Sequence, residues 1–279
     1  MPRTTPRIVA AAGAAALALI LAACAPAGDS AGTSDSGYVT DGKLTIGTGL
    51  PAYYPWVIDD APESGEGFEA AVAYAVADEL GFDKSDVVWV RSTFEQAVAP
   101  GAKDFDVNIQ QFSITEERKA NVDFSSPYYE TTQVVITTAA SKAADATSIA
   151  DLKGLLIGAQ TGTTSFDAVE QQIAPTAGAQ VFNTNDDAKL ALENGTVDAI
   201  VVDLPTAFYL TGVELTDGLI VGQLPQTEGD GDAFGLVLSK DSPLTASVTA
   251  AVDALRESGK LQELADTWLS DAADAPPLS

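Results

Sequence analysis

Residues 113–129 read SITEERKANVDFSSPYY and contain the most specific pattern in the chain. Ser113 with Glu116 matches a capping box, in which a hydroxyl group and an acid satisfy the first free N–H groups of a helix. Arg118 then falls in the first turn of that helix, whose cap is Ser113 or Thr115, where the helix dipole disfavours a cation. A basic side chain at this position needs an anionic partner, and the free backbone N–H groups beside it also favour an anion. Arg118 is therefore a candidate ligand-binding residue; the alternative is a surface ion pair with a neighbouring glutamate.

Strand and helix patterns alternate on both sides of this stretch. Before it, apolar residues recur at helical spacing from Phe68 to Leu80, and Thr93 with Gln96 forms a further capping box. The strand patterns of the chain lie at 43–47, 87–90, 105–109, 134–136, 155–158, 199–202 and 234–238. Helices are expected to begin near Thr164, Asp186, Pro205 and Ser242. Strands that alternate with helices of about ten residues predict α/β units around largely parallel sheets.

The composition excludes several classes of protein. The 279 residues include 40 Asp and Glu against 14 Lys and Arg, and the resulting net charge of −26 repels nucleic acids and anionic lipids. The sequence has no histidine, which excludes His-based catalytic triads and His-containing metal sites. The acidic stretch 59–63 does not have the spacing of a calcium loop. We therefore expect no metal site, no cofactor and no nucleic-acid partner.

The N-terminus has the pattern of an exported lipoprotein. Arg3 and Arg7 precede an apolar run at 8–21, which is too short to span a bilayer comfortably but suits a signal peptide. The run ends in Leu-Ala-Ala-Cys, which resembles the bacterial lipobox, and this cysteine is the only one in the chain. Cys24 is therefore the predicted lipidation site; the alternative is an ordinary export signal with an incidental Cys24.

The segments around this cysteine complete the prediction. Residues 1–23 would be a lipoprotein signal peptide and residues 24–39 a flexible tether, since 25–37 contain only Ala, Pro, Gly, Asp, Ser and Thr. The protein would then be anchored on the extracytoplasmic face of the cell membrane, in contact with the membrane through its lipid alone.

Several stretches of the chain together resemble the extracellular solute-binding proteins, family 3, of polar amino-acid ABC importers. Besides 113–129, the matching stretches are 43–48, 53–56, 67–69, 93–95, 151–154, 162–164 and 234–236. The resemblance covers residues 40–270 and implies the α/β, two-lobed fold of periplasmic binding proteins. In that fold each lobe is a sheet flanked by helices, and two crossings join the lobes at a hinge. The first lobe would hold residues 40–133 plus 232–279 and the second residues 134–231, with crossings near 131–135 and 230–234.

The resemblance also implies which residues bind the two charged ends of an amino acid. Arg118 would clamp the carboxylate in bidentate fashion, and Ser113 and the backbone around Gln111 would complete its contacts. Asp203 would pair with the α-ammonium group. The alternative for Asp203 is a helix cap, because an acid directly before a helix that starts with proline is a common cap.

Four further residues are expected at the ligand site. The resemblance implies that Phe94 stacks on the ligand, and Tyr53 is expected in the same pocket. Both could instead be core aromatics, as we expect for Trp56. Thr163 and Thr164 match a turn of the second lobe that also meets the carboxylate, and plain helix capping is their alternative role.

Three positions depart from the family pattern. Gly49 stands where many members have an aspartate that contacts the ligand side chain in binders of cationic or amide amino acids. Gln110 and Gln111 occupy positions where serine or glycine is common, and Ala71 replaces a usual acid. The missing acid at Gly49 favours a neutral amino acid as ligand.

The predicted function is capture of an amino acid between the lobes and delivery to the permease and ATPase subunits of an ABC importer. Such a binder, which we expect to be a monomer, needs no nucleophile, so no catalytic residue is assigned and the chain is not expected to be an enzyme. One alternative is an enzyme on the same fold, of the cyclohexadienyl dehydratase type, with a carboxylate or lysine as its acid. The other is a surface lipoprotein that senses a ligand without transport.

Overall fold

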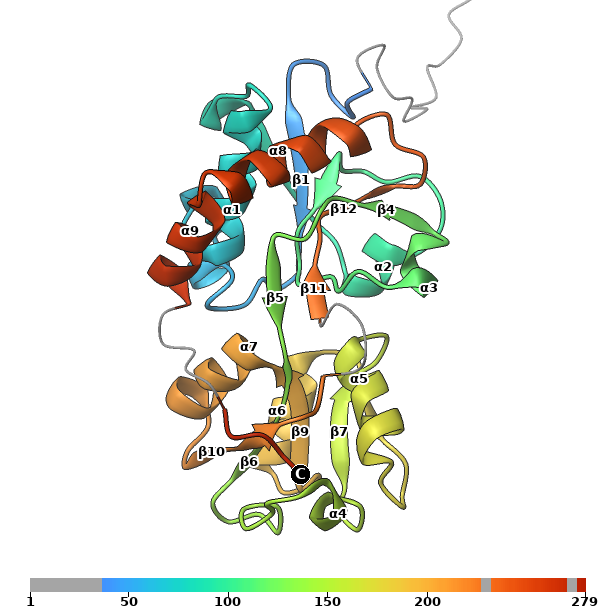
Figure 1. Ribbon diagram of the computed structural model, residues 1–279, viewed down its shortest axis with the longest axis vertical. Coiled ribbons are helices and arrows are strands. Elements are labelled where there is room, and N and C mark those ends of the chain that lie inside the picture. The colour runs from blue at the N-terminus through green and yellow to red at the C-terminus, as the bar shows by residue number, and fades with distance from the viewer. Residues whose placement is uncertain (1–36, 227–231, 270–274) are drawn as a thin grey trace, which may run out of the picture. The chain divides into compact units, whose positions relative to one another are not determined.

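The computed structural model of the chain describes residues 37–226, 232–269 and 275–279, which all fall in one unit of contacts, residues 32–279. The predicted signal peptide, Cys24 and most of the tether lie outside the described residues. The described part folds into two α/β lobes, each built on a five-stranded sheet (Figure 1). Within these ranges no helix has the length and apolar character needed to cross a membrane.

The first lobe has a mixed sheet with helices on both faces. In spatial order its strands are β2 (Val87–Arg91), β1 (Leu44–Thr48), β3 (Val107–Asn108), β12 (Val237–Ser239) and β4 (Val122–Phe124). Its helices are α1 (Phe68–Glu79), α2 (Phe94–Val98), α3 (Glu116–Lys119), α8 (Thr245–Glu257) and α9 (Lys260–Trp268). The predicted helical face of α1 is confirmed, because Phe68, Val72 and Val76 are fully buried in the core shared with α8 and α9.

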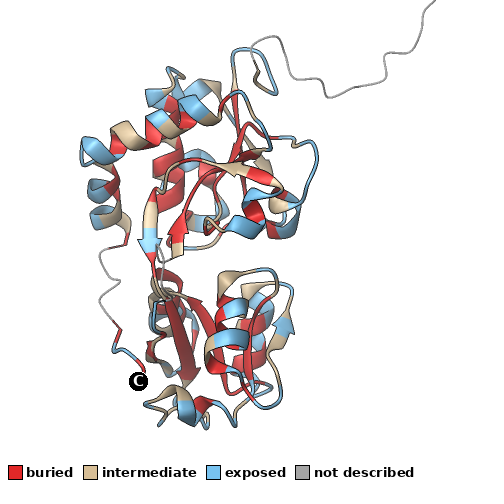
Figure 2. Cartoon of the chain, turned by 45° about the vertical axis from the view of Figure 1, so that its right-hand side comes forward, coloured by how far each residue is buried: buried red, intermediate tan, exposed pale blue. Residues whose placement is uncertain are grey.

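The second lobe repeats this arrangement. In spatial order its strands are β10 (Gly218–Gln223), β6 (Gln133–Thr138), β9 (Ala199–Asp203), β7 (Ile157–Gln160) and β8 (Gln180–Phe182). Its α-helices are α4 (Ile149–Leu152), α5 (Thr164–Ala168), α6 (Asn185–Glu193) and α7 (Leu204–Tyr209). Alternate residues of β6 enter opposite cores, Val134 with α6 and α7 and Val135 with α4 and α5, as the two-residue period of a strand requires. Figure 2 shows the strands of both sheets as largely buried.

A two-stranded ribbon forms the hinge region. β5 (Tyr129–Thr131) pairs antiparallel with β11 (Asp232–Phe234), and β5 continues past Thr132 into β6 of the second sheet (Figure 1). This is the first of the two expected crossings. The second expected crossing, near 230–234, lies partly outside the described residues, which resume at β11. The two-lobed α/β fold expected from the resemblance is thus confirmed.

The end of the chain departs from the expected domain boundary. Residues 275–279 lie along β10 of the second lobe, where Gln223 donates its backbone N–H to Pro276 and accepts from Leu278, each at 2.9 Å. Leu278 and Ala275 are buried in the two cores of that lobe. The assignment of the whole segment 232–279 to the first lobe therefore does not describe these last five residues, because their apolar side chains bury against the second sheet.

The sheets are largely parallel, as expected: in each, four of the five strands run in one direction, and β12 in the first lobe and β6 in the second run antiparallel to them. Two other local expectations were wrong. The strand pattern at 234–238 divides into β11 and β12, which belong to different sheets. The helix expected at Ser242 begins at Thr245, although the hydroxyl of Ser242 still accepts a hydrogen bond from the Leu244 N–H.

Candidate functional site

A small cavity of about 40 Å3 lies where side chains of the two lobes meet. Its lining includes every residue predicted to bind the ligand: Tyr53, Phe94, Gln111, Ser113, Arg118, Thr163, Thr164 and Asp203. Four further residues complete the lining: Gln110, Gln160, Ser165 and Asn185. The structure therefore gathers the predicted residues in one place, and their contacts decide what each can do there.

Arg118 is a buried cation, with only 9% of its surface exposed. It lies in the short helix α3, where the Thr115 hydroxyl accepts a hydrogen bond from the Arg118 N–H, so the cap is Thr115 and not Ser113. Among the described residues no carboxylate reaches ion-pair distance of Arg118; Glu116 pairs with Lys119 instead. The surface ion pair considered above is thus not formed.

The guanidinium of Arg118 is held in place from both lobes. Its Nη1 donates to the carbonyl oxygen of Ser113 at 2.7 Å, and its Nη2 donates to the carbonyl oxygen of Gly162 in the second lobe at 2.9 Å. The ring of Phe94 lies 5.1 Å from the guanidinium carbon and packs on Phe112. Burial lowers the pKa of Arg118, and nearby acids counteract this effect. A guanidinium held in this way retains N–H groups that can receive an anion.

Asp203 ends β9 and stands at the N-cap position of α7, which has Pro205 in its first turn. Its side chain makes no capping hydrogen bond. Instead its Oδ1 accepts from Nε2 of Gln133 at 2.9 Å, because β6 and β9 pair in the register that sets Gln133 opposite Asp203. Burial, and then the charge of Asp232, raise the pKa of Asp203 to about 8. The helix-cap role is therefore not observed.

Gln133 connects the carboxylates at the hinge, a role that the sequence pattern did not reveal. Its Nε2 also donates to Oδ2 of Asp232 at 2.7 Å, and its Oε1 accepts from the Ser165 hydroxyl at 2.6 Å. The residues that meet here are far apart in the chain and come together only through strand register. The sequence contained no local signal for this contact.

Glu69 is the second residue that sequence reasoning missed. It is fully buried in the first turn of α1 and accepts hydrogen bonds from the Tyr128 hydroxyl and from the backbone and side chain of Gln111. Burial raises the pKa of Glu69 to about 7. These bonds hold Gln111 at φ 49°, in the left-handed region. The Gln111 N–H, expected to meet the ligand carboxylate, is thus bonded to Glu69.

The remaining predicted residues combine capping with contacts between the lobes. Thr163 caps α5, since its hydroxyl accepts from the Phe166 N–H at 3.1 Å. Thr164 meets Ser113 of the first lobe, with their hydroxyl oxygens 3.1 Å apart. Tyr53 lies near Asp186 of the second lobe, and burial raises its pKa above the usual range.

Trp56, expected as a core aromatic, is 1% exposed and packs in the first-lobe core. Its indole N–H also donates to the hydroxyl oxygen of Thr206 in the second lobe at 3.1 Å.

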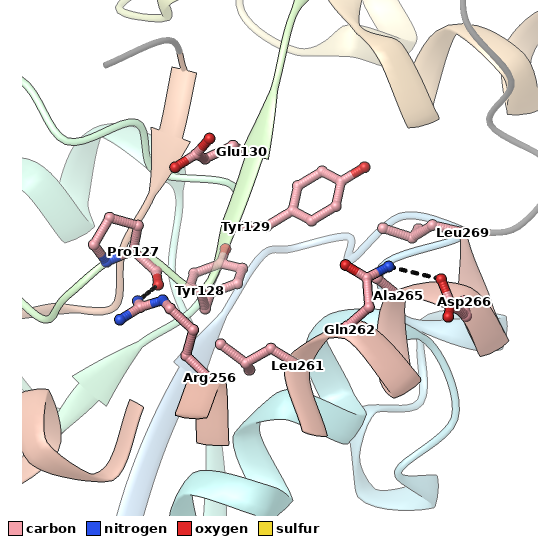
Figure 3. A pocket seen from close by; sticks show the side chains of 10 residues that line it. All are labelled: Pro127, Tyr128, Tyr129, Glu130, Arg256, Leu261, Gln262, Ala265, Asp266 and Leu269. Atoms are coloured by element: carbon pink, nitrogen blue, oxygen red, sulfur yellow. Dashed lines mark hydrogen bonds between the residues drawn. The ribbon is translucent and has the colours of Figure 1, made fainter. Parts of the chain in front are cut away.

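A larger cavity, of about 810 Å3, lies in the first lobe between β5 and helices α8 and α9 (Figure 3). Two of its polar side chains are bonded within the cavity: Arg256 donates to the carbonyl oxygen of Pro127, and Gln262 donates to Asp266 at 2.7 Å. Its described lining residues include no buried cation like Arg118 of the small cavity, since Arg256 is exposed. Within the described ranges no group of side chains could hold a metal ion.

The chain is similar to a family of known proteins over most of its length. The family described as bacterial extracellular solute-binding proteins, family 3, matches residues 44–271. The L-arginine-binding protein of Pseudomonas aeruginosa is 30% identical over 240 residues, covering 84% of this chain and 90% of the relative.

Two solved structures are also similar. An ancestral arginine-binding protein bound to arginine has a TM-score of 0.66 at 30% identity, covering 81% of this chain and 98% of the other. The ancestral amino acid-binding protein AncCDT-1, a precursor of cyclohexadienyl dehydratase, has a TM-score of 0.66 at 28% identity, covering 82% and 95%.

Proposed function

Since the chain belongs to the bacterial extracellular solute-binding proteins, family 3, we propose that it captures a free amino acid between its lobes and delivers it to an ABC importer. One observation carries the proposal: the buried Arg118 of the first lobe and the half-buried Asp203 of the second line the same cavity, without a direct charged partner among the described residues. A cation and an acid so placed complement the carboxylate and the ammonium group of a zwitterion.

Ligand binding would exchange contacts between the lobes for contacts to the ligand. In this structure Ser113 bonds Thr164, and Arg118 bonds the carbonyl oxygen of Gly162, so polar groups of the two lobes satisfy one another. An amino-acid carboxylate offers acceptors to the same guanidinium and hydroxyl groups. The ligand shifts the lobes toward the bound arrangement only by its greater affinity for that arrangement. Capture therefore requires no covalent step.

Calorimetric titration with the protein amino acids tests the proposal. Removing one partner of a buried charged contact weakens binding by about 30-fold to several thousand-fold, and we expect this loss for Arg118→Ala. Arg256→Ala is the matched control, because Arg256 lines the other cavity. The ligand should be recovered unchanged after incubation. If no amino acid binds, or if Arg118→Ala binds as tightly as the control, the proposed site is wrong.

We further propose that the protein acts as a monomer, anchored through lipid on Cys24 on the extracytoplasmic face of the membrane, beside the permease and ATPase of its importer. The support is the lipobox-like sequence at 21–24 and the small-residue tether that follows it. Cys24→Ser should release the protein from cells or leave it unprocessed. A Cys24→Ser protein that is normally processed and still bound to the membrane would contradict the anchor.

A further inference from the structure

One buried acceptor at the cavity has no partner. Gln110 follows β3 and lines the cavity, and its Oε1 is buried without a hydrogen-bond partner among the described residues. Buried side-chain oxygens are bonded in the large majority of cases, and an unbonded one is costly. The neighbouring Gln111 by contrast donates both its backbone N–H and its side-chain Nε2 to Glu69. The free oxygen of Gln110 thus marks a place where a ligand could supply an N–H group.

Gln110 also occupies the space beside Gly49. A Cβ atom at Gly49 would lie 3.0 Å from Nε2 of Gln110 and 2.7 Å from the carbonyl oxygen of Pro51. The backbone oxygen of Pro51 by itself leaves no room for a side chain at position 49. The neutral amide of Gln110, which follows β3, lies beside this acid-free end of β1.

A second cavity, of about 310 Å3, adjoins the first and shares Tyr53, Gln111 and Asn185 with it. It is large enough to take a long side chain that extends from the first cavity. Its charged lining consists of four carboxylates and one cation: Asp59, Asp60, Asp186, Glu214 and Lys189. Lys189 is paired with Glu214 at 2.7 Å and Asp60 with Arg91 of β2 at 2.5 Å, so the excess negative charge of this cavity comes from Asp59 and Asp186.

Resting on the proposed function, we propose that Gln110 determines specificity by accepting an N–H group from the ligand side chain. The ligand is then an amino acid with a long side chain that ends in N–H donors. A guanidinium or ammonium group is favoured over a neutral amide, because the adjoining cavity is acidic. Gly49 alone favoured a neutral ligand; the amide of Gln110 supplies the acceptor that the missing acid would have provided.

The test compares four ligands: arginine, glutamine, norleucine and glutamate. The wild type should bind arginine or glutamine more tightly than norleucine, whose side chain is similar in length to that of glutamine but has no N–H group. Gln110→Leu should lower the affinity for the preferred ligand about 10-fold or more, and it should change the affinity for norleucine by less than about 2-fold. Gln262→Leu is the matched control, since its amide bonds Asp266 far from this lining. Gln110→Glu should raise the affinity for arginine relative to that for glutamine, because it adds a negative charge without changing the size of the side chain.

Two results would overturn the proposal. The first is a wild type that binds norleucine or glutamate as tightly as arginine and glutamine. The second is a Gln110→Leu protein whose affinity for all four ligands falls equally. The second result would make Gln110 a structural residue, and the melting temperature of the ligand-free variants would show the same loss. Binding that depends on Arg118 but not on Gln110 sinks this inference and leaves the proposed function standing. A wild type that binds none of these four ligands but binds another amino acid also sinks this inference alone, whereas a wild type that binds no protein amino acid sinks the proposed function itself.

Discussion

Two carboxyl groups with raised pKa values, Asp203 and Glu69, dominate the chemistry of the site at the scale of single residues. Burial raises the pKa of Asp203 to about 8 and that of Glu69 to about 7, so both groups are largely or partly protonated at neutral pH without ligand. Each is held by hydrogen bonds to an amide side chain, Asp203 by Gln133 and Glu69 by Gln111. Asp203 thus carries a proton in the ligand-free protein, and the ammonium group of a ligand would displace this proton.

The first prediction concerns stability against pH. Because the pKa of Asp203 is raised in the folded protein, the folded state binds more protons than the unfolded state between about pH 4 and pH 8. This contribution to the free energy of unfolding is complete at the acid end and is lost as the pH rises toward 8. Thermal unfolding of the ligand-free protein from pH 5 to 8 should show a smaller decline in Asp203→Asn than in the wild type. An unchanged slope in the variant would contradict the raised pKa.

The second prediction concerns the proton that ligand binding displaces. An ammonium group beside Asp203 favours the carboxylate, so binding below about pH 8 should release a proton, and affinity should rise from pH 5 to 8. Calorimetry in buffers of different ionisation enthalpy measures the number released. Proton uptake, or affinity that falls over this range, would show that Asp203 does not meet the ammonium group.

At the scale of elements, sequence patterns predicted what depends on neighbours in the chain. The capping box of Thr93 and Gln96 is present, and α1 has its expected face. The contacts of Gln133 with Asp203 and of Glu69 with Gln111 were missed, because strand register and loop packing join residues that are 70 and 42 positions apart. The resemblance placed the eight ligand residues near one cavity, but it did not reveal the supports behind them.

The third prediction concerns the start of α1. Gly67 has φ 101°, and a Cβ atom there would lie 2.6 Å from the carbonyl oxygen of Trp56. Gly67→Ala should therefore lower the free energy of unfolding by about 3 kcal/mol, from backbone strain and the clash together. Gly154→Ala is the control, because its Cβ atom would meet nothing within 4 Å. Denaturant unfolding of both variants measures this difference. Equal free energies of unfolding for the two variants would contradict the role of Gly67.

At the scale of the whole molecule, contacts outside the ligand cavity also join the lobes, such as the packing of Tyr54 on Tyr209. The indole of Trp56 reaches Thr206 across the lobes, and the last five residues pack on the second sheet although helix α9 belongs to the first lobe. The sequence did not predict this return of the chain, because residues 275–279 contain too few apolar positions to show which sheet would bury them.

The fourth prediction concerns this C-terminal segment. Deleting residues 275–279 removes the buried Leu278 and the hydrogen bonds to Gln223. The free energy of unfolding should fall by about 2–4 kcal/mol, since burial of a leucine contributes about 2 kcal/mol and the bonds add to it. Hydrogen exchange should show the loss of protection along β10 rather than in the first lobe. A deletion protein as stable as the full chain would mean that the segment does not pack there in solution.

The central claim is that Asp203 receives the α-ammonium group of an amino acid whose carboxylate binds Arg118. The most direct measurement is calorimetric titration of wild type and Asp203→Asn with the best-binding amino acid and with its analogue that lacks the α-amino group. Wild type should discriminate against the analogue by about 30-fold or more, as expected for a buried charged contact. Asp203→Asn keeps the shape of the site and should lose most of this discrimination. If the variant discriminates as strongly as wild type, the ammonium group binds elsewhere and the account of the site is wrong.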